Sequence, residues 1–197
     1  MIRMENLIFV TGNRFKVMSA QYVLDKYNTG IKVIGKKIDC PEIQADTIED
    51  VAKFSSKYAS DKLKATVLKN DTGIIIPELK DFPGPYTKYV AETIGAKGII
   101  KLMEDAKNRS AIFIECNALT EYGKEPIVFF SRTEGTISEK ADGEHGTEWD
   151  KIFIPKGQEK TLANFDDSER VKMWDEQGMI DLAKYIKNKT KDNEREF

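Results

Sequence analysis

Residues 7–34, LIFVTGNRFKVMSAQYVLDKYNTGIKVI, decide the fold class of this chain. The apolar run Leu7–Val10 ends at Thr11–Asn13, which is typical of a buried strand that enters a turn. Apolar side chains then recur at helical spacing between residues 15 and 27, and Ile31–Ile34 is a second short apolar strand. The order strand, polar glycine-containing turn, helix and strand predicts an α/β fold.

Two further stretches extend this pattern toward the middle of the chain. Thr47 precedes the segment Ile48–Leu63, and a hydroxyl residue followed by acidic residues predicts the start of a helix. Val67–Leu68 and Ile74–Ile76 are apolar and flank the polar residues Asn70–Gly73. This arrangement predicts two strands joined by a turn.

The second half contains two long β-rich segments, 110–120 and 127–137, which we expect to form a hairpin that turns at Tyr122–Gly123. The remaining expected elements are a rigid loop at Phe82–Pro85, a helix over 87–105 broken near Gly95 or Gly98, a polar loop over 142–155 and a final helix over 167–186. We expect the charged tail, 187–197, to fray.

The composition fits one domain and excludes several kinds of protein. The chain has 197 residues, of which 40% are hydrophobic, enough to build a core. Its 31 basic and 33 acidic residues give a net charge of −2, which disfavours a protein that coats nucleic acid. Two cysteines and one histidine exclude a disulfide scaffold and a Cys/His zinc cluster, and they disfavour a Ser–His–Asp hydrolase.

The sequence also bears on where the protein works. Its apolar stretches are too short for a membrane span, and the N-terminus lacks the apolar segment and small residues of a signal peptide. We therefore expect a cytoplasmic protein without membrane or nucleic-acid partners.

The turn at Thr11-Gly12-Asn13 lies where a strand meets a helix, a position at which α/β proteins gather ligands. Free N–H groups and the positive end of the helix dipole favour an anion there, Gly12 permits close backbone approach, and Lys16 adds a charge. This suggests a phosphate-binding turn without the Walker A spacing. An ordinary turn with a solvated lysine explains the motif equally simply, and the motif alone favours that explanation.

Several acidic residues stand in turn-like contexts: Asp39, Glu42, Asp46, Asp71 and Asp150. Two or three converging carboxylates would bind Mg²⁺, which prefers oxygen ligands, and would orient a water for attack on phosphorus. The simpler interpretation is that each acid caps a turn or is solvated. Asp71 is the strongest candidate, because it lies between two apolar stretches near a sheet edge.

Trp149 lies in the polar loop, where it could stack on a base or plug the core. Tryptophans in such loops are more often core residues. Trp174, in the final helical segment, is expected to belong to the core.

Taken in order, seven short segments resemble the inosine triphosphate pyrophosphatase family, hydrolases of non-standard purine nucleoside triphosphates. They are TGNRFK (11–16), KIDCPEIQAD (37–46), NDTG (70–73), FPGPYTKY (82–89), SRTEGTI (131–137), EWDKIF (148–153) and SER (168–170). No single segment is specific, but the ordered set covers nearly the whole chain.

The resemblance implies roles for individual residues at the phosphate end of a substrate. Thr11, Asn13 and Lys16 match the motif that holds the triphosphate. Glu42 matches a metal ligand, and Asp71 matches an acid that binds metal and activates water. On this basis we expect Lys16 and Asp71 to be catalytic and the metal to be Mg²⁺.

The resemblance also implies a base-binding end. Trp149 and Asp150 match the stretch that contacts base and ribose, and Arg170 matches an arginine near the base. We include the neighbouring Glu169, together with Thr72, among the expected substrate-binding residues. The implied fold is an elongated mixed β-sheet flanked by helices, with residues 1–197 forming one domain of two lobes around a central cleft. Most members of the family are homodimers, so we expect one here.

Six positions depart from the family pattern. The residues found are Ser19 for a glutamate, Ser55 for a lysine, Asn70 for the first of two acids, Thr147 for an aromatic residue, Glu148 for a glycine and Glu169 for a histidine. The phosphate and metal groups are mostly kept, whereas the base pocket is changed.

Glu169 leaves two interpretations of the base pocket open. A 6-oxo purine presents an acceptor oxygen, to which an ionised carboxylate cannot donate. Either the base differs from inosine or xanthine, or Arg170 and backbone N–H groups read the oxygen while Glu169 points away.

The expected function is Mg²⁺-dependent hydrolysis of triphosphates such as ITP, dITP and XTP to the monophosphate and pyrophosphate. One alternative is a related pyrophosphatase that acts on a modified pyrimidine or adenine nucleotide. The other is a catalytically weak nucleotide-binding protein, since the departures occur together.

Overall fold

The first strand, helix and second strand form the unit that the opening sequence predicts. The computed structural model describes residues 5–195, with β1 (Asn6–Phe9), α1 (Arg14–Lys26) and β2 (Lys32–Gly35) at its start. β1 and β2 pair in parallel. Asn13 caps α1, because its side-chain oxygen accepts a hydrogen bond of 2.9 Å from the N–H of Phe15.

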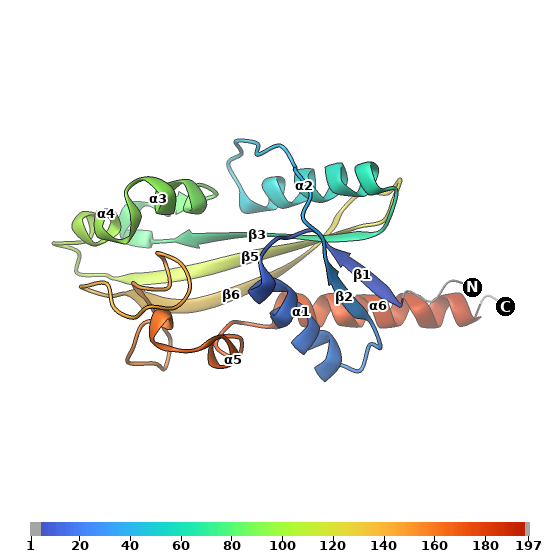
Figure 1. Cartoon of the computed structure of the whole chain (residues 1–197). Helices are drawn as coiled ribbons and strands as arrows, with labels where there is room; N and C mark the ends of the chain where they lie inside the picture. Colours follow the sequence, from blue (N-terminus) through green and yellow to red (C-terminus); the bar gives the residue numbers. More distant parts are fainter. Residues whose placement is uncertain (1–4, 196–197) are drawn as a thin grey trace.

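Long antiparallel strands form the centre of an elongated, curled sheet (Figure 1). They are β3 (Val67–Ile75), β5 (Ser110–Thr120) and β6 (Ile127–Ile137), and the short β4 (Pro83–Gly84) and β7 (Phe153–Pro155) lie at the edges. The order is β2-β1-β3-β5-β6-β7, with β4 paired to β3. The predicted mixed α/β sheet and the bounds of both hairpin strands are confirmed.

The prediction of a turn at Asn70–Gly73 is wrong, because β3 is continuous and pairs with β5 from Val67 to Ile75. Gly73 lies where the strand passes under a helix and beside β4. A Cβ there would lie 2.5 Å from Ile48 Cδ1 and 2.6 Å from the carbonyl oxygen of Gly84. This glycine therefore serves close packing and not a turn.

One edge of β3 is open at its centre. β1 pairs with β3 only at Val67 and Leu68, and β4 pairs with it only at Ile74 and Ile75. Among the strands that the structure describes, none therefore pairs with residues 69–73 on this side. The open edge lies between the two ends of the molecule, where ligands reach α/β sheets.

Helices cover both faces of the sheet (Figure 1). α2 (Ile48–Leu63) packs on β3 and β5, and its bounds and the Thr47 cap are as predicted. α1 and α6 (Gln177–Arg195) cover the opposite face, where α6 packs on β6. One buried cluster lies beneath α1 and α6, and a second surrounds Phe113 and Phe153 at the other end.

The helix expected over 87–105 is broken, as predicted, near Gly95. α3 (Thr87–Thr93) ends there and α4 (Gly95–Leu102) begins, with Gly95 at a φ of +61°. A short 3₁₀ turn, η1 (Pro77–Leu79), precedes β4. The loop expected at Phe82–Pro85 contains β4, a strand of two residues.

The single final helix expected over 167–186 is instead two helices. A 3₁₀ turn, η2 (Leu162–Asn164), leads to α5 (Asp167–Arg170), and α6 starts only at Gln177. Asp175 breaks the helix because its N–H donates to Thr133 Oγ1 and its carboxylate accepts from the N–H of Arg132, both on β6. α6 then runs to Arg195, beyond the predicted end at Ile186; residues 196–197 of the expected frayed tail lie outside the described residues.

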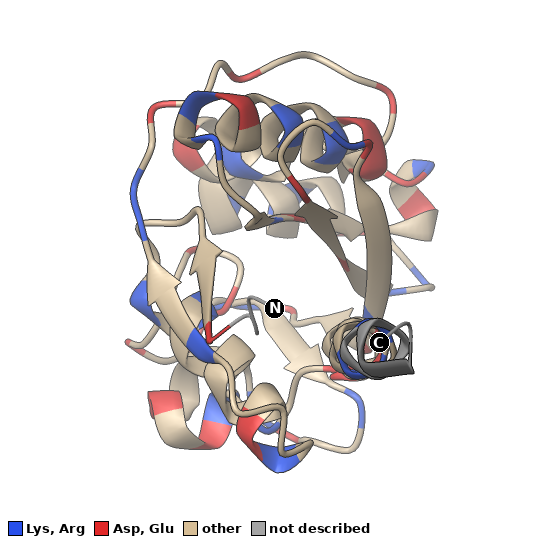
Figure 2. Ribbon diagram, turned by 90° about the vertical axis from the view of Figure 1, so that its right-hand side faces the viewer, with Lys and Arg blue, Asp and Glu red and all other residues tan. Residues whose placement is uncertain are grey.

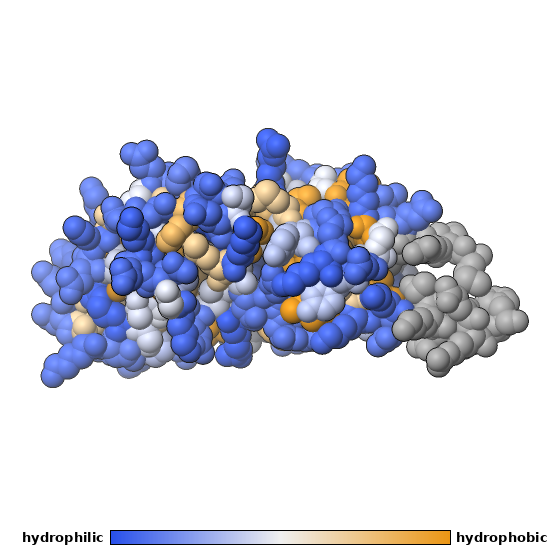
Figure 3. Space-filling model, turned by 90° about the horizontal axis from the view of Figure 1, so that it is seen from below, coloured by the Kyte–Doolittle hydropathy of each residue, from blue (hydrophilic) through white to orange (hydrophobic). Residues whose placement is uncertain are grey.

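The surface matches the near-neutral composition. Basic and acidic residues alternate over the helices (Figure 2), and the face seen from below is mostly hydrophilic with scattered apolar residues (Figure 3). In the described part of the chain, every helix is too short or too polar to cross a membrane.

Candidate active site

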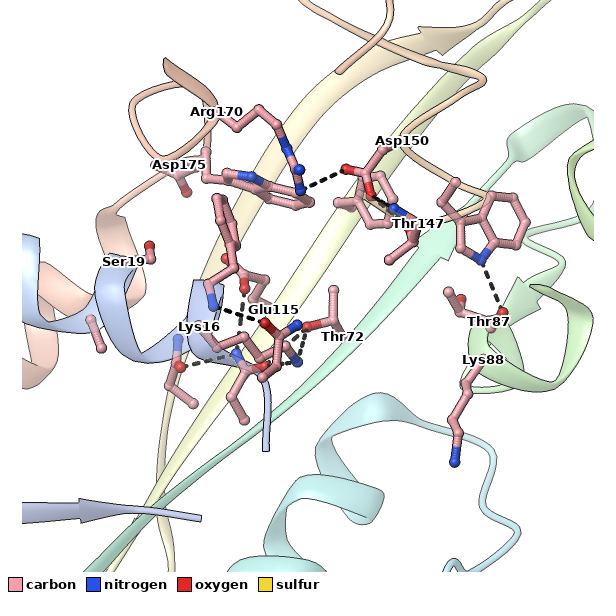
Figure 4. Close-up of a pocket in the computed structure, with 18 of the residues that line it drawn as sticks. Lys16, Ser19, Thr72, Thr87, Lys88, Glu115, Thr147, Asp150, Arg170 and Asp175 are labelled. Carbon is pink, nitrogen blue, oxygen red and sulfur yellow. Dashed lines mark hydrogen bonds and ion pairs between the residues drawn. The ribbon is translucent and has the colours of Figure 1, made fainter. Parts of the chain in front are cut away.

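A cleft of about 440 Å³ lies beside the open edge of β3 (Figure 4). Its walls come from α1, β3, β5, the loop before β7 and the segment from α5 to the start of α6. The residues discussed below that line it are Asn13, Phe15, Lys16, Asn70, Thr72, Glu115, Asn117, Thr147, Trp149, Asp150 and Arg170. Trp174, which was expected to belong to the core, packs against Phe113 and also lines the cleft.

Lys16 is the cation at one end of the cleft. The first turn of α1 directs its side chain to β3, where Nζ donates to Asn70 Oδ1 and, at 3.0 Å, to Thr72 Oγ1. Removal from water lowers the pKa of Lys16, and the nearby carboxylate of Glu115 is the largest opposing influence. An ammonium held in this way suits a phosphate group.

Asn70 connects Lys16 to two polar side chains of β5. Its Nδ2 donates to Asn117 Oδ1 at 3.0 Å and to Glu115 Oε1 at 3.5 Å. Burial raises the pKa of Glu115, opposed first by the charge of Lys16 and then by the hydrogen bond from Asn70.

Sequence reasoning missed Glu115 and Asn117. The available signal was alternation: with 110–120 predicted as a strand, residues 113, 115 and 117 share one face. Two polar residues on that face of an apolar strand point to a polar site.

The Thr11–Asn13 turn forms as predicted, but only part of it reaches the cleft. The hydroxyl oxygen of Thr11 accepts from the N–H of Asn13 at 3.0 Å. Asn13 lines the cleft, whereas Thr11 and Gly12 line a neighbouring groove on the surface. A Cβ at Gly12 would meet only the Lys37 side chain, at 3.5 Å, so packing of the free protein does not demand a glycine there.

Asp71 lies beside the cleft on the opposite face of the sheet from Asn70 and Thr72, because side chains alternate along β3. Burial raises the pKa of Asp71. The charges of Lys16 and Lys69 lower this pKa, and the charge of Glu42 raises it further.

Glu42 lies in the loop before α2, is largely exposed and forms an ion pair of 2.5 Å with Lys88. Within residues 5–195 there is no group of three or more His, Cys, Asp or Glu side chains able to bind a metal. Glu42 and Asp71 are nevertheless close enough to influence each other electrostatically. Two carboxylates that leave further positions for phosphate oxygens and water are a donor set that fits Mg²⁺.

Trp149 and Asp150 are both buried and both organise the wall of the cleft. The indole N–H of Trp149 donates to the carbonyl oxygen of Thr87 at 3.0 Å, which fixes the loop to the start of α3. Asp150 accepts from the N–H of Thr147 at 2.5 Å and from its hydroxyl at 2.6 Å. Gly146, at a φ of +77°, makes room, because a Cβ there would lie 2.5 Å from Asp150 Oδ2.

Arg170 is buried at the other end of the cleft from Lys16. Its guanidinium lies 4.7 Å from the centre of the Phe15 ring and forms ion pairs with Asp167 at 3.2 Å and Asp150 at 3.5 Å. Its buried Nε finds no hydrogen-bond partner among the side chains and backbone that the structure describes. This end therefore offers a donor and an aromatic face.

Glu169 lies outside the cleft lining although its neighbour Arg170 lines it. It is exposed at the start of α5, where its carboxylate accepts from the N–H of Asp166 at 3.1 Å. Asp166 caps the same helix in return, so the two residues form a capping box.

Comparisons with known proteins show which family and which solved structures the chain resembles. The model of the Ham1 family matches residues 7–175. The chain is 39% identical over 167 residues to the dITP/XTP pyrophosphatase of Methanopyrus kandleri, covering 85% of this chain and 88% of that protein. It is 37% identical over 164 residues to that of Thermococcus kodakarensis, covering 83% and 87%. Among solved structures, a HAM1 protein from Coxiella burnetii shares the fold with a TM-score of 0.77 at 21% identity, over 94% of this chain and 100% of that one.

Proposed function

Because this chain belongs to the Ham1 family, as the sequence resemblance predicted, we propose that it hydrolyses non-standard purine nucleoside triphosphates. The substrates are of the dITP and XTP type, after the relatives named dITP/XTP pyrophosphatase, and the products are the monophosphate and pyrophosphate. The observation that carries the proposal is the cleft, which has a partly buried lysine at one end and a buried arginine against an aromatic ring at the other.

The lysine end receives the phosphates. Water attacks the α-phosphorus in line, and the pyrophosphate leaves with the charge that develops on its oxygen. Lys16 stabilises this charge from a fixed position, and Thr72 and Asn13 line the same end.

Asp71 orients the attacking water, and with Glu42 it would hold Mg²⁺ together with phosphate oxygens. When bound, Mg²⁺ would neutralise part of the charge of the phosphates. Lys88 of α3 forms an ion pair with Glu42, and this contact links the loop before α2 to α3.

The arginine end receives the base. The Arg170 guanidinium lines the cleft, and its N–H donors match the acceptor oxygen of a 6-oxo purine. Glu169 is occupied in the capping box, which favours the alternative in which it points away from the base. Trp149 and Asp150 shape the wall, so their contribution to binding is through the position of the loop.

The same resemblance supports a homodimer that acts in the cytoplasm, and we include both in the proposal. Neither depends on the residues of the cleft.

The test is pyrophosphate release from a panel of triphosphates with and without Mg²⁺. We expect turnover of dITP, ITP and XTP that needs Mg²⁺ and exceeds turnover of ATP and GTP. Preference for a modified pyrimidine or an adenine nucleotide would favour the related pyrophosphatase. Binding of triphosphates without turnover of any would favour the nucleotide-binding protein.

A further inference from the structure

The Lys16 ammonium is a cation held by neutral groups. Nζ donates to the amide oxygen of Asn70 and to the hydroxyl of Thr72. None of the ion pairs formed by the described residues includes Lys16. A cation removed from water without a countercharge is costly, so a compensating carboxylate is expected nearby.

The orientation of the Asn70 amide identifies that carboxylate. Oδ1 faces the ammonium of Lys16, and it also accepts from the Thr72 hydroxyl at 3.0 Å. Nδ2 therefore faces β5, where it donates to Glu115 and Asn117. The opposite orientation would place an NH₂ donor against an ammonium, so the network itself fixes the amide. Figure 4 shows Lys16, Thr72 and Glu115 close to one another.

We propose that Glu115 is a positioning residue of the phosphate site, which holds the Lys16 ammonium in place through the Asn70 amide and supplies its countercharge. This rests on the proposed function, because Lys16 is taken to receive the phosphates. The register of the sheet supports it: Thr72 lies opposite Glu115 and Asn70 opposite Asn117, so Glu115 is the diagonal neighbour of Asn70.

Asn70 and Glu115 are a matched pair. An aspartate at position 70 would have only acceptor oxygens, and these would face the oxygens of Glu115 and Asn117 without a hydrogen atom between them. With Glu115 on β5, the amide of asparagine is the group that bridges cation and anion. The negative charge at the Lys16 end of the cleft is therefore that of Glu115 on β5, a position outside the segments that resemble the family.

The charges that face Lys16 agree with this role. Burial lowers the pKa of Lys16, the carboxylates of Glu115 and then Asp71 raise it, and Lys69 lowers it slightly. Glu115 is thus the largest electrostatic support for the protonated lysine. The charge of Lys16 and the hydrogen bond from Asn70 lower the pKa of Glu115, whereas the charge of Asp175 raises it.

The first test compares Glu115→Gln with Glu104→Gln, which removes the same charge from an exposed position outside the cleft lining. We would measure kcat/KM for ITP against pH, and the Kd of α,β-methylene ITP over the same range. An opposite charge near an ionisable group shifts its pKa by roughly 1–3 units. We expect the alkaline limb of both profiles to move down by roughly one pH unit in Glu115→Gln and to stay in place in Glu104→Gln.

The second test adds Asn70→Asp to the wild type and to Glu115→Gln. In the wild type the aspartate meets the Glu115 oxygens, so kcat/KM should fall. In Glu115→Gln the new aspartate faces an amide and places a carboxylate directly beside Lys16. The alkaline limb should therefore return to its wild-type position, and kcat/KM should rise. Opposite signs in the two backgrounds are the mark of a coupled pair.

An unmoved alkaline limb in Glu115→Gln, or the same effect of Asn70→Asp in both backgrounds, would overturn the proposal. Absence of turnover in the wild type would instead overturn the proposed function. The binding profiles of the analogue would still decide the role of Glu115 in that case. Thermal unfolding of each variant separates these outcomes from loss of the fold.

Discussion

Asn70 and Asp71 are adjacent on β3 but face opposite sides of the sheet. Asn70 lies in the cleft and binds Lys16, whereas Asp71 lies on the side covered by α2, where burial raises the pKa of its carboxyl. The edge of β3 is open at this point. Under the proposed function, Asn70 positions the cation and Asp71 acts on water.

Asp71→Asn should therefore lower kcat by roughly 10²-fold or more, the range typical of losing a general base. Steady-state pyrophosphate release measures this. Asp46→Asn, a change at an exposed acid of the loop before α2, is the matched control. Turnover close to that of the wild type in Asp71→Asn would remove Asp71 from the mechanism.

Glu169→Ala should change stability and leave the choice of base unchanged. The variant loses the bond from the Asp166 N–H, a loss of about 0.5–1 kcal/mol in the free energy of unfolding. Glu169→Gln keeps an acceptor for that N–H and should retain most of the stability. Denaturant unfolding and the ratio of kcat/KM for ITP and ATP, which differ at position 6 of the base, give the two readouts, and a changed ratio would show that Glu169 reads the base.

At the scale of elements, local signals predicted the parts of the fold that local interactions determine. The Thr47 cap and the acidic first turn predicted α2, and the β-rich composition of two segments predicted β5 and β6. The turn-like composition of Asn70–Gly73 misled, because pairing with β5 and contact with Ile48 outweigh it. The break before α6 depends on hydrogen bonds to β6, which no local pattern reveals.

Gly73→Ala tests the packing of β3 against α2. The added Cβ would lie 2.5 Å from Ile48 Cδ1 and 2.6 Å from a backbone oxygen, so the strand or the helix must shift. We expect a loss of about 1–3 kcal/mol in the free energy of unfolding, the usual cost of overpacking. Gly12→Ala meets only a flexible lysine at 3.5 Å and is the control for stability. Equal stability of the two variants would contradict this account of Gly73.

Over the whole molecule, most of the residues named from the sequence meet at one cleft, whereas their partners were not predicted. Lys16, Asn13, Thr72, Trp149, Asp150 and Arg170 all line the cleft, while Glu42 and Asp71 lie beside it. Glu115 and Asn117 were missed because their meeting with Asn70 depends on the register between β3 and β5. Register is a property of the assembled sheet, so a single sequence does not display it.

The proposed function implies one orientation of the substrate, with the phosphates at Lys16 and the base at Arg170. In that orientation the α-phosphorus would lie between them, near the open edge of β3.

The central claim is that water attacks the α-phosphorus, and hydrolysis of ITP in ¹⁸O-labelled water tests it most directly. Mass spectrometry of the products would locate the label. We predict one ¹⁸O atom in the inosine monophosphate and none in the pyrophosphate. Label in the pyrophosphate, or release of labelled inorganic phosphate with inosine diphosphate, would contradict the account.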